Sequence, residues 1–137
     1  MMEVISDSED GTTMEITATV TAIGPHAISQ TDPLVILFGK DATPELADVS
    51  VIQQFDEPSQ QKQLALHHGD HIFINDIKFR VSEVGSLTNA NLQQIGHATL
   101  MFQPVPSEDR LGNAVYLVPT ARPTFTIGTT IRYVMQD

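Results

Sequence analysis

The sequence predicts an all-β fold, a small barrel-like domain of about seven short strands with one or two short helices. Short runs of β-favouring apolar residues recur along the chain, and turns that contain proline or glycine separate them. No long helical segments alternate with these runs, which argues against a doubly wound α/β sheet. Closing the strands into a barrel removes the exposed sheet edges that favour aggregation.

The first half of the chain contains the following predicted elements. Apolar residues alternate with threonines over residues 16–22, and this period of two predicts a half-buried strand. The apolar run Leu34–Phe38 is typical of a short buried strand. Thr43 followed by Pro44 has the order of a helix cap and a first helical residue, so we expect a short helical turn there. Strand spacing resumes over residues 49–55.

The second half begins with a polar segment, residues 56–63, which its proline and glutamines predict to be an exposed, flexible loop. Two strand runs, residues 71–74 and 77–84, flank the turn pair Asn75–Asp76, a pattern typical of a β-hairpin. Residues 88–96 combine a polar cap, an apolar pair and a final glycine, which predicts a two-turn helix. Further strands are predicted at residues 97–102, 114–118 and 129–135.

Length and charge limit the number of domains and the classes of partner that we expect for this chain. The chain has 137 residues, 17 acidic and 7 basic residues, and a formal charge of −10. We expect one β domain over residues 15–137 and an acidic, flexible N-terminal segment over residues 1–14. Residues 1–61 hold eleven acidic residues and Lys40 as the one base. Such a field repels phosphate backbones, so no nucleic-acid partner is expected.

The compartment is predicted from what the sequence lacks. The chain has no cysteine, which excludes disulfides and thiolate metal sites and fits the reducing cytoplasm. The acidic start does not resemble a signal peptide, and the longest apolar run is too short to span a bilayer. We therefore expect a cytoplasmic protein without membrane insertion, and the sequence leaves its oligomeric state open.

Histidines are the candidate reactive residues. His67, His68, Asp70 and His71 are potential metal ligands, but an extended chain points His68 away from its neighbours, and we expect a hairpin entrance here, with no metal and no cofactor. His97 opens a strand directly after Gly96. Backbone groups at that junction are suited to hold one ring nitrogen and to leave the other free, so both a structural and a functional role stay open.

One segment carries a family resemblance. Residues 82–102 contain a Val-Gly-Ser turn, an Asn-Leu helix, the step Gly96–His97 and a Thr-Leu-x-Phe strand, in this order. This order resembles the IIA component of the glucitol/sorbitol-specific phosphotransferase system. The residues 17–24 strand, the Leu34–Phe38 strand and the Leu66–Gly69 turn also fit, so the resemblance covers about residues 15–135. It implies a β-rich, barrel-like fold.

The resemblance also implies an activity and partners. In that family a cytoplasmic IIA domain takes a phosphoryl group from phospho-HPr onto a histidine and passes it to a IIB domain, which phosphorylates the incoming sugar. A neutral ring nitrogen is suited to such an in-line transfer. The implied partners are an HPr-like phosphocarrier and the IIB and IIC components of a sugar permease. A IIA domain does not carry the sugar pocket, so the sequence does not identify the sugar.

The chain departs from the family pattern at the acceptor position. Counting onward from Phe38 without a gap brings that position to Gln53, where no histidine stands. A carboxamide nitrogen is delocalised into its carbonyl and is not a useful nucleophile. Three interpretations stay open: a phosphorylation-incompetent relative that keeps the fold and the partner surface, acceptance by another histidine with His97 as the first candidate, and a role unrelated to sugar transport.

Overall fold

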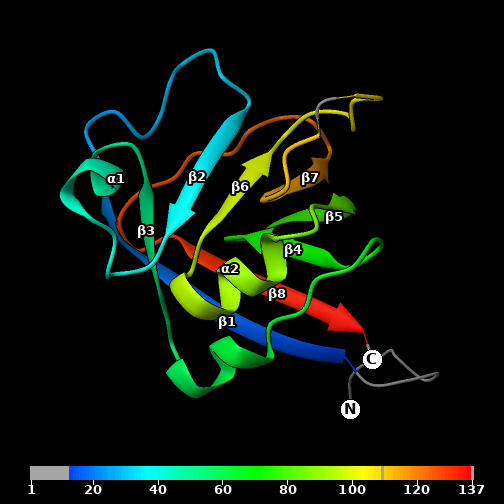
Figure 1. Ribbon diagram of the computed structural model, residues 1–137, viewed down its shortest axis with the longest axis horizontal. Helices are drawn as coiled ribbons and strands as arrows, with labels where there is room; N and C mark the ends of the chain where they lie inside the picture. Colours follow the sequence, from blue (N-terminus) through cyan, green and yellow to red (C-terminus); the bar gives the residue numbers. More distant parts are fainter. Residues whose placement is uncertain (1–12, 109, 137) are drawn as a thin grey trace.

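Eight strands close into a barrel in the computed structural model, which describes residues 13–108 and 110–136 (Figure 1). The strands are β1 (Thr13–Ile23), β2 (Leu34–Phe38), β3 (Val51–Phe55), β4 (His71–Ile74), β5 (Ile77–Val84), β6 (Ala98–Met101), β7 (Ala114–Val118) and β8 (Thr130–Gln136). Two α-helices, α1 (Pro44–Asp48) and α2 (Thr88–Ile95), and a 3₁₀ helix, η2 (Pro58–Gln63), complete the described elements. The all-β, barrel-like prediction is confirmed.

The strands follow the order β1-β3-β2-β6-β7-β5-β4-β8 around the barrel. β2 and β3 pair in parallel, as do β6 and β7, and the other neighbours are antiparallel. The first and last strands, β1 and β8, pair with each other, with Thr13 opposite Gln136 and Thr19 opposite Thr130. The pairing of β1 with β3 contains a register shift between Val20 and Ala22, beyond the last residue that pairs with β8.

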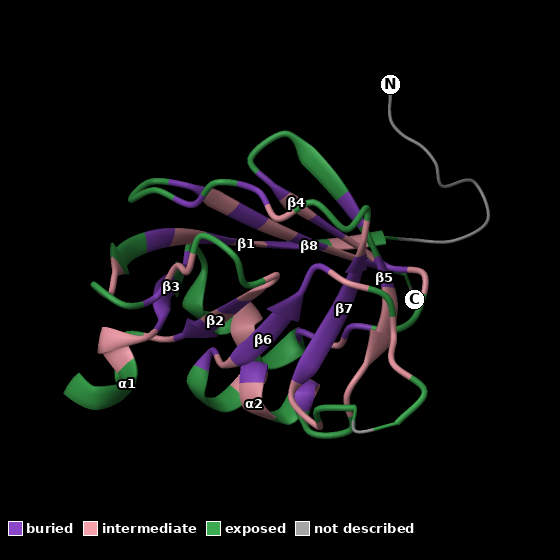
Figure 2. Cartoon of the chain, turned by 90° about the horizontal axis from the view of Figure 1, so that it is seen from above, coloured by how far each residue is buried: buried purple, intermediate pink, exposed green. Residues whose placement is uncertain are grey.

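Side chains that alternate along the strands fill the barrel. Ile16, Ala18 and Val20 of β1 are at most 1% exposed and meet inward residues of the other strands, among them Tyr133 of β8. β6 is buried on both faces (Figure 2), because a second cluster packs outside it. That cluster comprises Met101, Ala114 and Tyr116, with Leu34 and Val105 against them. The apolar interior therefore provides most of the burial that stabilises the fold.

Several predicted elements appear with the expected chemistry. The Thr43 side chain accepts a hydrogen bond from the backbone N–H of Leu46 at 3.3 Å and caps α1. Asn75 has φ of 53° in the turn between β4 and β5, which confirms the hairpin. Gly96 has φ of 66° and ends α2 in the left-handed conformation.

Two expectations differ from the structure, and a third falls mostly outside the described residues. The predicted polar cap of α2 is wrong, because the N-cap residue is Leu87 and no side chain caps the helix. The Thr88 hydroxyl instead donates to the carbonyl oxygen of Ala114 at 3.1 Å. The predicted loop at residues 56–63 contains η2. The Gln61 side-chain amide donates to the Leu92 carbonyl of α2, and the Gln93 amide of α2 donates to the Leu64 carbonyl just after η2. Of the acidic N-terminal segment, residues 1–12 lie outside the described residues, and β1 begins at Thr13.

Within the described part of the chain, no helix has the length and apolar character needed to cross a membrane.

Substituting Gly96 tests the end of α2. We expect Gly96→Val to lower the free energy of unfolding by at least about 1 kcal/mol, because a β-branched residue is strained at positive φ. A Cβ atom there would also lie 3.0 Å from the backbone nitrogen of Gly39. Urea denaturation measures the change. Gly112→Ala is the control, since its Cβ would meet side-chain atoms of Leu87 alone, at 3.4 Å and beyond. Equal stability of Gly96→Val and the wild type would contradict this account.

Candidate functional site

Gln53 lies at the centre of β3 with its side chain inside the barrel. It shares the inward face of the strand with Val51 and Phe55, and it is 1% exposed. Its Nε2 donates to the carbonyl oxygen of Gly96 at 3.0 Å, and its Oε1 accepts from the Tyr133 hydroxyl at 2.6 Å. The amide thus links β3 to β8 and to the end of α2, and both of its ends are bonded.

Tyr133 fixes the orientation of this amide. Complete burial raises the pKa of the Tyr133 hydroxyl well above its usual range, so the group stays protonated near neutral pH. A protonated hydroxyl that donates to Gln53 requires the carbonyl end of the amide to face it, which leaves the NH₂ group for the Gly96 carbonyl. The Gln53 nitrogen is therefore a donor with no lone pair to offer.

His97 lies one residue beyond Gly96, in the same corner as Gln53. Its Nδ1 is 3.0 Å from the carbonyl oxygen of Leu37, which can only accept, so this nitrogen carries a proton. Its Nε2 is 2.7 Å from the side-chain amide nitrogen of Asn113 and accepts from it. The ring stacks on Phe38, with centroids 4.2 Å apart. The group that binds Nδ1 belongs to β2 and not to the junction of α2 and β6, and Asn113 binds Nε2, so the expectation of one free ring nitrogen was wrong.

A cleft of about 140 Å³ opens beside Gln53. Its walls come from the segment after β2, from β3, from η2 and from the end of α2. The lining residues are Gly39, Lys40, Asp41, Gln53, Gln54, Phe55, Pro58, Gln61, Gln94 and Ile95. The backbone N–H of Gly39 donates to the Ile95 carbonyl at 2.9 Å, and a Cβ at Gly39 would lie 2.8 Å from that oxygen. Glycine is therefore needed for this close approach.

Several residues that line the cleft carry hydrogen-bond donors in addition to Gln53. Gln54 and Gln94 are exposed and present carboxamides, Lys40 adds an ammonium group, and Asp41 adds a carboxylate. Phe55 and Pro58 supply apolar surface. The arrangement is suited to bind a polar or anionic group of a partner, and its components lie on segments that are distant in the sequence.

The other candidate histidines lie elsewhere. Asp70 is buried and accepts from the backbone N–H groups of His67 at 2.7 Å and Gln136 at 3.2 Å. His68 contacts the Ser82 carbonyl at 2.7 Å, and its other ring nitrogen faces Arg80. Across residues 13–108 and 110–136, no three histidine or carboxylate side chains gather as a metal site would need. The residues at the entrance of the hairpin therefore serve the turn and its surface.

Removal of the Gln53 amide tests its structural role. We expect Gln53→Leu to destabilise the fold by about 1–3 kcal/mol, because the Tyr133 hydroxyl and the Gly96 carbonyl would lose their buried partner. Thermal or urea denaturation measures this loss. Gln54→Leu is the matched control, since Gln54 is exposed on the same strand and its replacement leaves the network intact. Equal stabilities of the two variants would refute the role assigned to Gln53.

Comparison with known proteins agrees with this fold. The family described as the PTS system glucitol/sorbitol-specific IIA component matches residues 15–132. The crystal structure of a PTS system IIA component from Enterococcus faecalis V583 superposes with a TM-score of 0.82 at 45% identity, covering 87% of this chain and 99% of that one. The PTS system glucitol/sorbitol-specific EIIA component of Escherichia coli (strain K12) is 33% identical over 85 residues, 61% of this chain and 66% of that protein. The matched part therefore spans slightly less than two thirds of that relative. The chain belongs to the glucitol/sorbitol-specific IIA family of the phosphotransferase system.

Proposed function

We propose that this protein works in a phosphoenolpyruvate-dependent sugar phosphotransferase system of the glucitol/sorbitol type, as a IIA-type subunit that binds its partners without accepting phosphoryl at Gln53. The family membership supports the system and the class of partner, an HPr-like phosphocarrier and a IIB component. The observation that carries the rest is the buried Gln53 amide, bonded at both ends. Such a subunit acts in the cytoplasm beside the membrane permease.

The chemistry of position 53 supports this proposal. A phosphoryl relay needs a nitrogen lone pair that attacks phosphorus in line and later leaves. The Gln53 nitrogen is conjugated with its carbonyl and donates to Gly96, so it has no such lone pair. The cleft around it nevertheless keeps Lys40 and the exposed amides of Gln54 and Gln94. These donors favour binding of a phosphorylated partner without transfer.

A relay through His97 is the second candidate. It is favoured by position, because His97 directly follows Gly96, whose carbonyl binds Gln53. The protonated Nδ1 leaves Nε2 as the nucleophilic nitrogen, and this atom accepts from Asn113. Transfer to Nε2 therefore requires the Asn113 side chain to turn away first.

Intact-mass spectrometry distinguishes the two candidates. The protein is incubated with phosphoenolpyruvate, enzyme I and HPr, with a phosphorylation-competent IIA domain of the same family in parallel, and is kept at neutral to mildly basic pH. We expect the control to gain one phosphoryl group and this protein to gain none. A gain by the wild type that His97→Asn abolishes would refute the proposal and assign the relay to His97.

The variant Gln53→His tests the register directly. We expect it to acquire acid-labile phosphate in the same assay, because it places a ring nitrogen at the position of the family acceptor, beside Lys40 and Gln54. Gln54→His is the matched control, one residue further along β3 and outside the barrel. Labelling of both variants to the same extent, or of neither, would contradict the assignment of position 53.

A further inference from the structure

The outer face of β8, β4 and β5 carries a cluster of cationic side chains on an otherwise acidic protein. Outward positions alternate with buried ones along all three strands. The registers place Phe73 opposite both Lys78 and Arg132, and His71 opposite Arg80. Lys78, Phe73 and Arg132 therefore form one row across the three strands. We call the outward residues Phe73, Lys78, Arg80 and Arg132, with His68 and His71, the basic sheet face.

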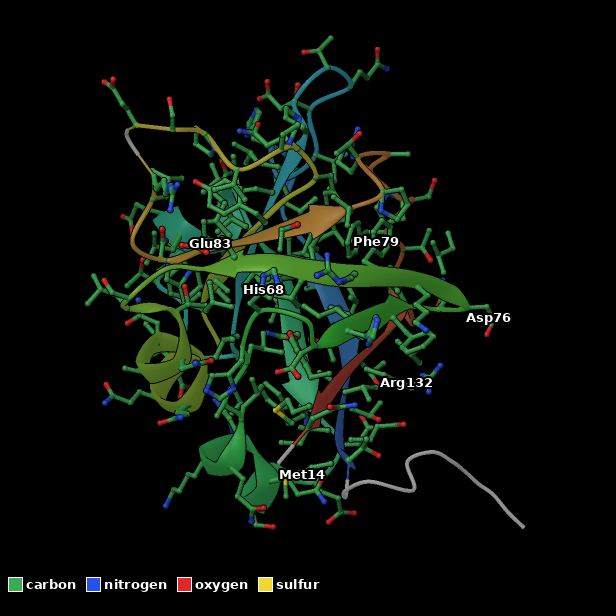
Figure 3. The ribbon with its side chains drawn as sticks, turned by 90° about the vertical axis from the view of Figure 1, so that its right-hand side faces the viewer. Met14, His68, Asp76, Phe79, Glu83 and Arg132 are labelled. Carbon is green, nitrogen blue, oxygen red and sulfur yellow. The ribbon has the colours of Figure 1, made fainter. Side chains whose placement is uncertain are left out.

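Short contacts order this face. The Arg132 guanidinium stacks over the Phe73 ring, 4.3 Å from its centroid, and contacts Glu15 of β1 at 3.4 Å. Arg80 lies 3.2 Å from Nε2 of His68. Figure 3 shows His68 and Arg132 on the same side of the molecule as the β4–β5 hairpin, whose tip carries Asp76. Neighbouring side chains thus position the guanidinium groups of Arg80 and Arg132.

The positive charge of this face is only partly balanced. Among the ion pairs of the described residues, Arg132 meets Glu15 and Glu83 meets Arg110, whereas neither Lys78 nor Arg80 meets a carboxylate. The carboxylate of Asp70 is buried and bonded to backbone N–H groups. The pKa of His71 is lowered by burial and then by Lys78, with a smaller effect of Arg80, while Asp70 opposes the shift. Adjacent cations without anions are destabilising by themselves, so a bound anion would relieve their repulsion.

The net negative charge of the chain limits the kind of anion that this face can bind. Eleven of the 17 acidic residues lie in residues 1–61, and the chain has a net charge of −10. A long polyanion such as nucleic acid, or an extended anionic membrane, would reach beyond this face and meet repulsion. A short acidic segment would not. Lys78 and Arg132 are two strand spacings apart, about 10 Å, which about three residues of an extended peptide span.

We propose that the basic sheet face binds a short acidic segment of a partner protein, with its carboxylates on Lys78, Arg80 and Arg132 and an apolar side chain beside the Phe73 ring, whose face Arg132 covers. The face is separate from the cleft, since β1 lies between β3, which lines the cleft, and β8, the nearest strand of the face. The proposal goes beyond the phosphotransferase function and does not depend on it.

Fluorescence anisotropy with a labelled peptide of glutamate and phenylalanine residues tests this surface. We expect the full chain to bind it at low salt and to release it at high salt. Lys78→Glu should weaken binding about ten-fold or more, and Lys78→Gln by less. Lys62→Glu is the matched control, because Lys62 is also exposed, lies on η2 away from this face and undergoes the same charge reversal. Circular dichroism verifies that each variant is folded.

Selective loss in the Lys78 variants supports the proposal. Equal losses in Lys78→Glu and Lys62→Glu would show an effect of net charge alone and would overturn it, as would a lack of binding by the wild type. Tighter binding of a single-stranded oligonucleotide or of phosphatidylglycerol vesicles than of the peptide would overturn the choice of an acidic protein segment.

Discussion

The candidate site depends on the two buried hydrogen bonds of the Gln53 carboxamide. This amide joins β3, β8 and the end of α2 through two hydrogen bonds inside the barrel. A buried amide stabilises a fold only when both of its ends are bonded, and here Tyr133 and Gly96 provide the two partners. The same bonds remove the nitrogen from any nucleophilic role. The position that the family resemblance assigns to phosphoryl acceptance is therefore a structural link in this protein.

Side-chain amides shape the cleft in a similar way. Asn89 bonds both the N–H and the carbonyl of Leu66, at 2.8 and 2.9 Å, and Gln61 donates to the Leu92 carbonyl at 3.0 Å. These contacts replace backbone ladder bonds where the chain leaves the sheet, and they hold η2 against α2. These helical segments thus complete the cleft wall opposite β3, around Gln53. The basic sheet face lies on β8, β4 and β5 of the closed barrel and is therefore a surface distinct from this cleft.

Local chemistry was predictable from the sequence, and long-range pairing was not. The Thr43 cap, the Asn75 turn and the left-handed Gly96 follow from neighbouring residues alone, and the structure confirms them. The sequence also indicated that Gln53 lacks a nucleophile, from its residue type. It did not indicate burial or a bond to Tyr133, which lies 80 residues away. The contact of His97 with Asn113 likewise depends on strand pairing that a local sequence pattern does not predict. The same holds for the row of cations across three strands.

The proposed function requires the cleft to bind a phosphocarrier although the Gln53 amide cannot accept phosphoryl. Binding can be measured by titrating the ¹⁵N-labelled protein with unlabelled HPr and recording two-dimensional NMR spectra. We expect saturable shifts at the backbone amides of Gly39, Lys40 and Gln94, with little change on the basic sheet face. An absence of shifts, or shifts confined to β4, β5 and β8, would contradict the proposed function.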